Sequence, residues 1–266
     1  MRILISNDDG IFANGIRALS EELSKNHEVY IVAPDGERSA AGHSLTLHMP
    51  LRIEKLDQPL YNSKESYVTN GTPGDCIKIA SGVIFKDKKI EPDLIISGIN
   101  HGPNLGMDVL YSGTVSCALE GAMLGIPAIA TSLAGLRWEY EDFDFASKFI
   151  ASFVDNKLKT FDFPPKSILN INIPPVEREK VSGIAITELG GRIFTDDYEM
   201  RIDPRGKNYY WMAGKLLKEP VDANTDISAI RQNKISITPM TYSMTHYALM
   251  DEMDDMICKT GNCNWF

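Results

Sequence analysis

Five short apolar runs recur along the N-terminal part of the chain, and the segments between them carry apolar residues at helical spacing. Short apolar runs bounded by turn residues are typical of strands buried on both faces of a parallel sheet. Between the first two runs, Ile16, Leu19 and Leu23 share one helical face, with Glu21 and Glu22 opposite. This stretch predicts a strand–helix–strand unit. The five runs occupy residues 2–6, 29–33, 93–97, 128–132 and 168–173.

Helix start signals extend the alternation. Thr72 can cap a helix that has Pro73 in its first position, and a second helix should begin near Thr114 and end before Gly125 and Pro127. A third helix fits residues 143–158. Alternating strands and helices predict a three-layer α/β sandwich with a mostly parallel sheet and right-handed crossovers.

The pattern changes near residue 180. Residues 183–189, 208–214 and 234–240 have the composition of antiparallel strands between turns, and residues 245–257 have the spacing of an amphipathic helix. We expect a first domain over residues 1–179 and an appended β-rich region over residues 180–266. The exposed strands and last helix of that region need cover, so we expect it to act as a dimerisation arm.

Composition and charge narrow the classes of function. The chain has 266 residues, is 43% hydrophobic and carries a formal net charge of -9, with acids and bases mixed. That charge argues against a nonspecific DNA-binding surface. A signal-peptide pattern is absent, and no apolar run approaches the roughly 18 residues of a membrane-spanning helix, so we expect a cytoplasmic protein that does not bind membranes. Free thiols are then expected at Cys76, Cys117, Cys258 and Cys263.

Polar clusters follow three of the predicted strands, at residues 7–10, 34–44 and 98–106. Ligands of open parallel sheets bind beyond the carboxyl ends of the strands, so these loops should converge. Hard divalent cations prefer carboxylate, amide and hydroxyl oxygens. Such a set is present in Asp8, Asp9, Ser39 and Asn100. Taken singly, the paired acids fit a helix cap or turn as well as a metal site, and Ser39 and Asn100 fit ordinary loop roles better; only their convergence favours a cation.

A Gly-rich stretch leads into the helix predicted near Thr114. Amides around Ser112, Gly113 and Thr114 would form a helix N-terminus suited to a phosphate, and ordinary capping by Ser112 or Thr114 is the alternative. Walker and Gly-x-Ser-x-Gly motifs are absent. A receiver domain also has paired acids after its first strand, but Ser97 and Gly98 stand where its phosphate-accepting aspartate would be.

Five motifs, in order across residues 3–122, resemble the SurE (survival protein E) nucleotidase family: "ILISNDDG", "ERSAAGHSLTL", "GTPGDC", "SGINHGPNLG" and "YSGTVSCALEG". The resemblance implies a Rossmann-like N-terminal domain, a C-terminal region used for assembly into a homodimer or homotetramer, and a metal-dependent phosphomonoesterase. Its substrates would be nucleoside 5′- and 3′-monophosphates and, in some members, short polyphosphate. One departure is Gly74, where alanine is more usual.

The resemblance also assigns residues. It implies that one Mg²⁺ or Mn²⁺ per subunit is bound by Asp8, Asp9, Ser39 and Asn100. It places Asn104, Ser112, Gly113 and Thr114 near the substrate phosphate. As a hypothesis, Asp8 and Asp9 are catalytic, and Asp9 rather than Asp8 orients or deprotonates the attacking water. Independently of the resemblance, His43 and His101 lie in two of the loops and are candidates for proton transfer, although an ordinary structural role fits each of them equally well. The opposing hypothesis is a non-catalytic metal or nucleotide sensor, which would bind the ion without releasing phosphate.

Overall fold

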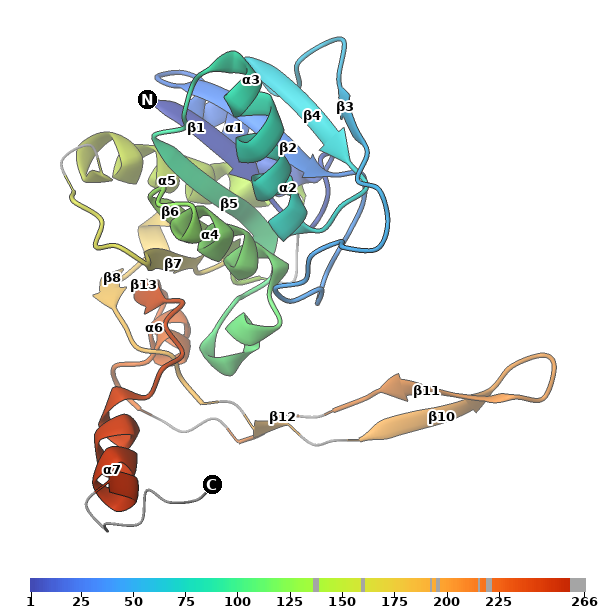
Figure 1. The fold of residues 1–266 in the computed structure, drawn as a ribbon, viewed down its shortest axis with the longest axis vertical. Helices are drawn as coiled ribbons and strands as arrows, with labels where there is room; N and C mark the ends of the chain where they lie inside the picture. Colours follow the sequence, from blue (N-terminus) through green and yellow to red (C-terminus); the bar gives the residue numbers. More distant parts are fainter. Residues whose placement is uncertain are drawn as a thin grey trace.

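The computed structural model describes residues 1–135, 139–158, 161–191, 193–194, 197–214, 216–218 and 222–258. Within these ranges the main sheet has nine strands in the order β3-β4-β2-β1-β5-β6-β7-β13-β8 (Figure 1). β3 (Ile53–Lys55) and β13 (Lys234–Thr241) pair antiparallel with the two ends of a parallel block. That block contains β4 (Glu65–Thr69), β2 (Glu28–Pro34), β1 (Arg2–Ser6), β5 (Leu94–His101), β6 (Ala128–Leu133) and β7 (Ser167–Ile173).

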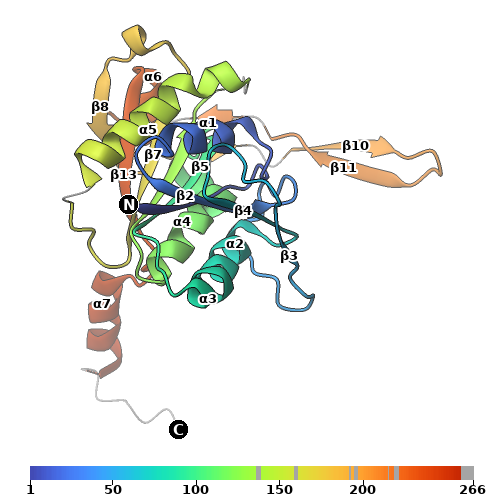
Figure 2. The same cartoon turned by 90° about the horizontal axis from the view of Figure 1, so that it is seen from above.

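Helices cover both faces of the sheet and give the predicted three layers. α1 (Asn14–Leu23) and α5 (Asp144–Asn156) lie on one face, and α2 (Pro73–Ile79) and α4 (Gly113–Met123) lie on the other (Figure 2). A π-helical turn, η1 (Ala80–Phe85), and α3 (Lys86–Lys88) continue from α2. The 3₁₀ turns are η2 (Gly106–Leu110), η3 (Tyr140–Phe143) and η5 (Arg178–Lys180). The mostly parallel α/β fold predicted from the sequence is confirmed.

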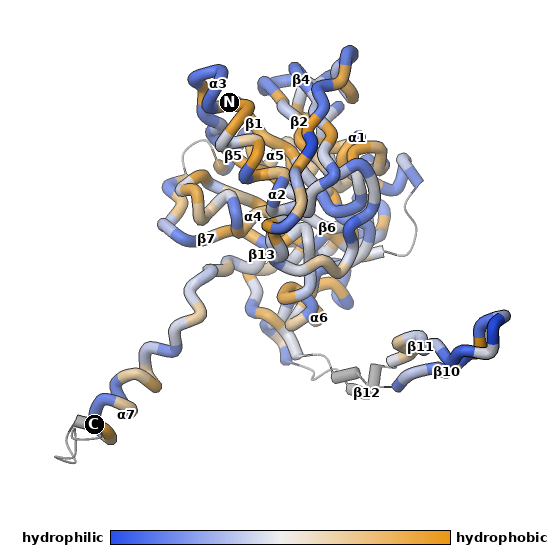
Figure 3. Tube along the Cα trace, turned by 45° about the vertical axis from the view of Figure 1, so that its right-hand side comes forward, coloured by the Kyte–Doolittle hydropathy of each residue, from blue (hydrophilic) through white to orange (hydrophobic). Residues whose placement is uncertain are grey.

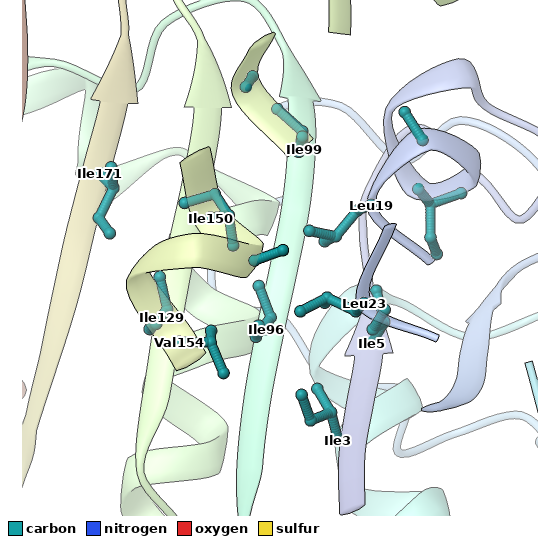
Figure 4. Packing of buried hydrophobic residues seen from close by; sticks show 14 of the residues in the cluster. Ile3, Ile5, Leu19, Leu23, Ile96, Ile99, Ile129, Ile150, Val154 and Ile171 are labelled. Carbon is teal, nitrogen blue, oxygen red and sulfur yellow. The ribbon is translucent and has the colours of Figure 1, made fainter. Parts of the chain in front are cut away.

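The core is divided by the sheet into two apolar layers. On the α1 and α5 side, Leu19 and Leu23 of α1 and Ile150 and Val154 of α5 are fully or almost fully buried against strand residues (Figure 4). Burial of each such side chain contributes about 1.5–3 kcal/mol, so this layer fixes the strand ends that carry the polar loops. The strand residues shown in this layer are Ile3, Ile5, Ile96, Ile99, Ile129 and Ile171.

Local signals set the helix starts near these loops. Thr72 Oγ1 accepts a hydrogen bond from the Asp75 N–H at 3.2 Å, and Asp75 Oδ2 accepts one from the Thr72 N–H at 2.9 Å, with Pro73 in the first helical position. This reciprocal cap confirms the predicted start of α2. In α4 the cap is Ser112, whose hydroxyl accepts from the Val115 N–H at 3.0 Å. The helix therefore begins at Gly113, and Thr114 is free for another partner.

The C-terminal region is only partly separate from the sheet. α6 (Asp226–Arg231) and β13 follow β8 (Gly183–Ile186), and β8 pairs parallel with β13. The expectation that residues 183–189 form an antiparallel strand is therefore wrong. Several short strands and the last helix project away from the part of the molecule that contains the main sheet (Figures 1 and 3). These elements are β9 (Ile193–Phe194), β10 (Tyr198–Ile202), β11 (Asn208–Met212), β12 (Leu216–Lys218) and α7 (Tyr247–Cys258).

Five strands were not predicted from the sequence, namely β3, β4, β9, β10 and β12. β4 and β3 form one edge of the sheet, and β10 pairs with β11 in an exposed hairpin. β3, β4 and β10 mix polar and apolar residues, and β9 and β12 have only two and three residues, so all five lack the continuous apolar run by which the buried strands were found. Cys76 and Cys117 are free and buried, as expected, whereas Cys263 lies outside the described residues. No helix in the described ranges is long and apolar enough to cross a membrane.

Candidate metal and phosphate site

Asp8 lies between the end of β1 and the N-terminus of α4. It is 5% exposed, and its Oδ1 accepts a hydrogen bond from the Thr114 hydroxyl at 2.5 Å. Gly113 is so close that an added Cβ would lie 2.8 Å from Asp8 Oδ2. The first turn of α4 can approach the carboxylate only because glycine stands at this position. The structure thus brings Asp8, Gly113 and Thr114 together, as their placement at strand and helix ends suggested.

Asp9 links the end of β1 to the end of β5. Its Oδ2 accepts a hydrogen bond from the His101 N–H at 3.1 Å, and its Oδ1 lies 3.5 Å from His101 Nδ1. The imidazole packs on Phe143, with the ring centroids 5.3 Å apart. Burial lowers the pKa of His101, which keeps the ring neutral near pH 7 and limits any charge it could offer Asp9. His101 therefore has the partner that could not be identified from the sequence.

The two carboxylates are held in an environment that disfavours their charges. Burial raises the pKa of Asp8, and the hydrogen bond from Thr114 opposes that rise. Burial and the adjacent charge of Asp8 raise the pKa of Asp9 to about 7. The charge of Glu37 raises both pKa values further. Among the described residues, no lysine or arginine forms an ion pair with either carboxylate. The site therefore lacks a positive charge that would offset its paired acids.

The loop after β2 brings Ser39 to the same end of the sheet. The Arg38 N–H donates to the backbone oxygen of Asp8 at 2.7 Å, and the Gly42 N–H donates to the backbone oxygen of Tyr111 at 3.1 Å. The Ser39 hydroxyl donates to Glu37 Oε1 at 2.6 Å. With its proton committed to Glu37, the Ser39 oxygen has lone pairs left for a cation. Glu37, which the sequence analysis did not select, stands two residues before Ser39 in the same motif.

A buried glutamate secures the far side of this loop. Glu120 of α4 has a side chain only 4% exposed, and its Oε1 lies 2.9 Å from His43 Nε2. Its Oε2 lies 2.9 Å from Lys78 Nζ of α2. His43 therefore has a structural partner on a neighbouring helix, and we call the three side chains the Glu120 latch. The sequence analysis missed Glu120 because its helical position carries no local sign of a partner 77 residues away.

Asn100 and Asn104 follow β5 in different settings. The Asn100 side-chain N–H donates to the backbone oxygen of Gly102 at 2.8 Å, which leaves Oδ1 as the atom that could face a cation. Asn104 is 7% exposed, and its side-chain N–H donates to Ser132 Oγ at 2.8 Å. Its backbone N–H donates to Asn172 Oδ1 at 2.9 Å. The side-chain N–H of Asn104 thus binds the protein, and the contact of this residue with a substrate phosphate remains a prediction.

The residues present fit a hard divalent cation. A buried acid pair without a positive partner is the charge arrangement such an ion would complete, and the neutral oxygens of Ser39 and Asn100 match its preferences. Asn7 Oδ1 beside the pair is buried and accepts no hydrogen bond. In the described part of the chain, no cluster of three or more His, Cys, Asp and Glu side chains could hold a metal. The residues that could hold a cation here are therefore two carboxylates and neutral oxygens, which differ from the donors of a zinc-type cluster.

Comparison with known proteins identifies the family of the chain. Residues 3–196 match the family described as Survival protein SurE. The chain belongs to the SurE family. The matched residues include the acid pair, the Ser39 loop, the Gly-rich loop and the start of α4, which are the segments of the candidate site.

Relatives match almost the whole length of the chain. A protein named 5′-nucleotidase SurE from Synechococcus elongatus is 44% identical, and the match covers 96% of this chain and 99% of that protein. The protein of the same name from Pelotomaculum thermopropionicum is 47% identical over 97% of this chain and 95% of its own length. A crystal structure of the SurE protein from Aquifex aeolicus superimposes with a TM-score of 0.79 at 38% identity, covering 96% and 99% of the two chains.

Proposed function

We propose that this protein is a divalent-metal-dependent nucleotidase that hydrolyses nucleoside 5′- and 3′-monophosphates to nucleoside and phosphate. The observation that carries the proposal is the Asp8–Thr114 contact, which joins a buried acid without a positive partner to the N-terminus of α4. A cation at the acids and amides at the helix start are the two features that bind a phosphate ester. The names of the relatives support nucleotides as the substrate class.

The residues around the acid pair would have different roles in metal binding and proton transfer. Asp8, Asp9, Ser39 and Asn100 would hold one Mg²⁺ or Mn²⁺; when bound, that ion neutralises phosphate charge and lowers the pKa of a water molecule. Asp9 is assigned to orient the attacking water and to accept its proton. Asp8 has Oδ1 occupied by Thr114, which suits it to a fixed ligand role rather than to proton transfer.

The start of α4 would receive the phosphate. The Gly113 N–H belongs to the first turn of the helix, where N–H groups have no intrahelical partner, and can donate to a phosphate oxygen. The Thr114 N–H, like its hydroxyl, interacts with the Asp8 carboxylate and would contact the phosphate from that position. The Ser112 hydroxyl accepts from Val115, so its own proton stays available to the substrate. These donors would stabilise the charge that develops on the equatorial oxygens. Asn104 would contribute from the neighbouring loop, and short polyphosphate is a further candidate substrate.

The test is phosphate release from a panel of nucleoside 5′- and 3′-monophosphates and a short polyphosphate, each with Mg²⁺, Mn²⁺ or EDTA. Turnover that needs the metal and disappears in Asp8→Ala supports the proposal, and the panel ranks the substrates. The unfolding curve of Asp8→Ala shows whether the variant is folded. Folded, metal-binding wild-type protein that releases no phosphate would instead be a sensor of metal or nucleotide.

The exposed arm suits assembly with a second copy of the chain. β10 and β11 pair only with each other within the described residues, and seven of their large apolar side chains are exposed. A two-stranded hairpin with both faces in water is marginal, so a partner chain would stabilise it. Light scattering should give the mass of a dimer or tetramer. Deletion of the β10–β11 hairpin should reduce the number of subunits in the assembly. The exposed side chains are Tyr198, Met200, Ile202, Tyr209, Tyr210, Trp211 and Met212.

A further inference from the structure

The loop that carries Asn104 is fixed to the sheet by buried hydrogen bonds on several sides. The backbone oxygen of Asn104 accepts from the side-chain N–H groups of Asn170 and Asn172, each at 2.9 Å. Together with the bonds of Asn104 to Asn172 and Ser132, these contacts fix one residue of the loop to β6 and β7. Further support for the loop comes from a residue outside the parallel block.

That support is Asp226, the first residue of α6. It is fully buried, and its Oδ2 accepts a hydrogen bond from the Gly106 N–H at 2.7 Å across 120 residues of sequence. Its Oδ1 accepts from the Gly190 N–H and the Ile227 N–H, each at 2.8 Å. Three backbone donors thus satisfy a carboxylate for which the described residues show no ion pair. Such charge-assisted bonds are about twice as strong as neutral ones.

The two glycines that Asp226 binds also touch each other. Gly106 has φ +55°, and a Cβ added to it would lie 2.3 Å from the backbone oxygen of Gly190. Only glycine permits this approach, because a side chain here would meet a backbone oxygen and not a movable group. The Gly-rich loop and the segment that follows β8 are therefore packed backbone to backbone, with Asp226 bonded to both.

Gly190 and Asp226 also lie at the two ends of the projecting arm, which is the segment that contains β9 to β12. The chain leaves the body just after Gly190, passes through β9 to β12 and returns before Asp226. Glu188 and Thr225 form a parallel bridge, and the Asp226 N–H donates to the backbone oxygen of Glu188 at 2.9 Å. Both ends of the arm are thus fastened at one point, and the carboxylate at that point also holds the loop of the candidate site.

We propose that Asp226 is a positioning residue that couples the base of the arm to the phosphate-binding loop. The assignment of that loop rests on the proposed function. A carboxylate that accepts from both Gly106 and Gly190 keeps the two segments in one geometry, and either segment loses its support if the other moves. Assembly through the arm would in this way set the affinity of the site for phosphate.

The test variant is Asp226→Asn, because its amide N–H₂ would face one of the two glycine N–H donors in place of an acceptor. We expect the dissociation constant of inorganic phosphate, measured by calorimetry with saturating Mn²⁺, to rise about tenfold, which is the usual effect of one lost charge-assisted bond. The dissociation constant of Mn²⁺ itself should stay within about twofold, since none of its expected ligands binds Asp226. Hydrogen exchange of residues 102–111 should become faster.

The matched control is Asp203→Asn. Asp203 also accepts backbone N–H groups, from Arg205 and Lys207, but it lies at the turn between β10 and β11. The phosphate affinity of the Asp203→Asn protein and the hydrogen exchange of its residues 102–111 should match those of the wild type. Unchanged phosphate affinity and unchanged exchange in Asp226→Asn would overturn the proposal.

A measurement on the unmodified protein keeps the test decisive if Asp226→Asn does not fold. Coupling between two sites is reciprocal, so phosphate with Mn²⁺ should slow hydrogen exchange at residues 186–191 and 224–227. Absence of that protection, with phosphate bound, would overturn the coupling. Neither measurement depends on turnover. If the protein binds phosphate without hydrolysing nucleotides, the proposed hydrolysis is refuted, and the same two measurements still test the role of Asp226.

Discussion

The Thr114 hydroxyl donates a hydrogen bond to Asp8 Oδ1 over 2.5 Å, although 106 residues separate the two in sequence. Both side chains are buried, Thr114 completely and Asp8 to 5% exposure. The contact holds the carboxylate against the first turn of α4, where its Oδ2 lies close to Gly113. It also ties the two halves of the proposed site together, because Asp8 belongs to the cation set and Thr114 to the phosphate cradle.

Thr114→Val should therefore damage the site more than the fold. Valine has nearly the shape of threonine but cannot donate, and a hydrogen bond to a charged group contributes about 1.5–3 kcal/mol. We expect kcat/KM for a nucleoside monophosphate to fall about 10- to 100-fold, with weaker Mn²⁺ binding. Enzyme assays and calorimetry give both quantities.

Thr187→Val provides the comparison. Thr187 is also buried, and its hydroxyl lies 2.7 Å from the hydroxyls of Ser236 and Thr238, away from the acid pair. This variant should lose stability and keep kcat/KM per folded molecule. Equal losses of activity in the two variants would show that Thr114 acts through the fold rather than through Asp8.

The paired acids should make the metal-free protein less stable than it could be. Asp9→Asn removes one of two adjacent carboxylates whose charges are disfavoured by burial and by each other. We expect its Tm in EDTA to lie above that of the wild type. Mn²⁺ should raise the Tm of the wild type, because it binds the folded state, and should raise that of Asp9→Asn much less.

Asp93→Asn tests whether this behaviour belongs to the site. Asp93 is exposed just before β5, at the opposite end of the strand, and accepts the Arg2 N–H at 2.6 Å. We expect no gain in Tm in EDTA and a wild-type response to Mn²⁺. An Asp9→Asn protein that is less stable than the wild type in EDTA would contradict the charge argument. Thermal unfolding scans settle both points.

The Glu120 latch should hold the Ser39 loop in place. His43→Ala removes the imidazole partner of Glu120 Oε1 and leaves the Lys78 pair intact, so the helices should stay folded. We expect trypsin to cleave after Arg38 several-fold faster, because local opening of the loop becomes more frequent. His48→Ala changes an exposed histidine of the same loop and should not alter the cleavage rate. If mass spectrometry finds the same rate in all three proteins, the latch does not restrain this loop.

Glu65 should make stability depend on acid pH. Burial raises its pKa, but hydrogen bonds from Lys55, Lys88 and Tyr67 outweigh burial and lower the pKa from 4.5 to about 2. A carboxylate whose pKa is lowered on folding stabilises the folded state at pH values above its unfolded-state pKa. That contribution is lost as the pH falls from 4.5 toward 2. We expect Glu65→Gln to reduce the free energy of unfolding by about 1–2 kcal/mol at pH 7, with the difference vanishing near pH 2.

Urea unfolding at a series of pH values measures that difference. Glu54→Gln changes an exposed glutamate on β3, the strand that pairs with β4, and should leave the pH profile as in the wild type. A constant difference between wild type and Glu65→Gln from pH 7 to pH 2 would mean that the ion pairs of Glu65 do not contribute through its charge.

The sequence by itself determined five of the six strands of the parallel block, most helix boundaries and the loops that meet at the carboxyl end of the sheet. Continuous apolar runs mark strands buried on both faces, and the Thr72–Pro73 cap marks a helix start, because both signals arise within a few residues. Since parallel strands end at one edge, Asp8, Asp9 and the Gly-rich loop could be placed at the same edge without knowledge of any contact.

Tertiary structure alone decided which residues meet. The bond from Thr114 to Asp8, the pairing of His43 with Glu120 and the position of Asp226 under the Gly-rich loop join segments that are 77 to 120 residues apart. Local periodicity records how much a residue is buried but not what it is buried against. The parallel direction of β8 and the insertion of β13 beside β7 were hidden for the same reason, since a strand's partner is chosen by the packing of the whole sheet.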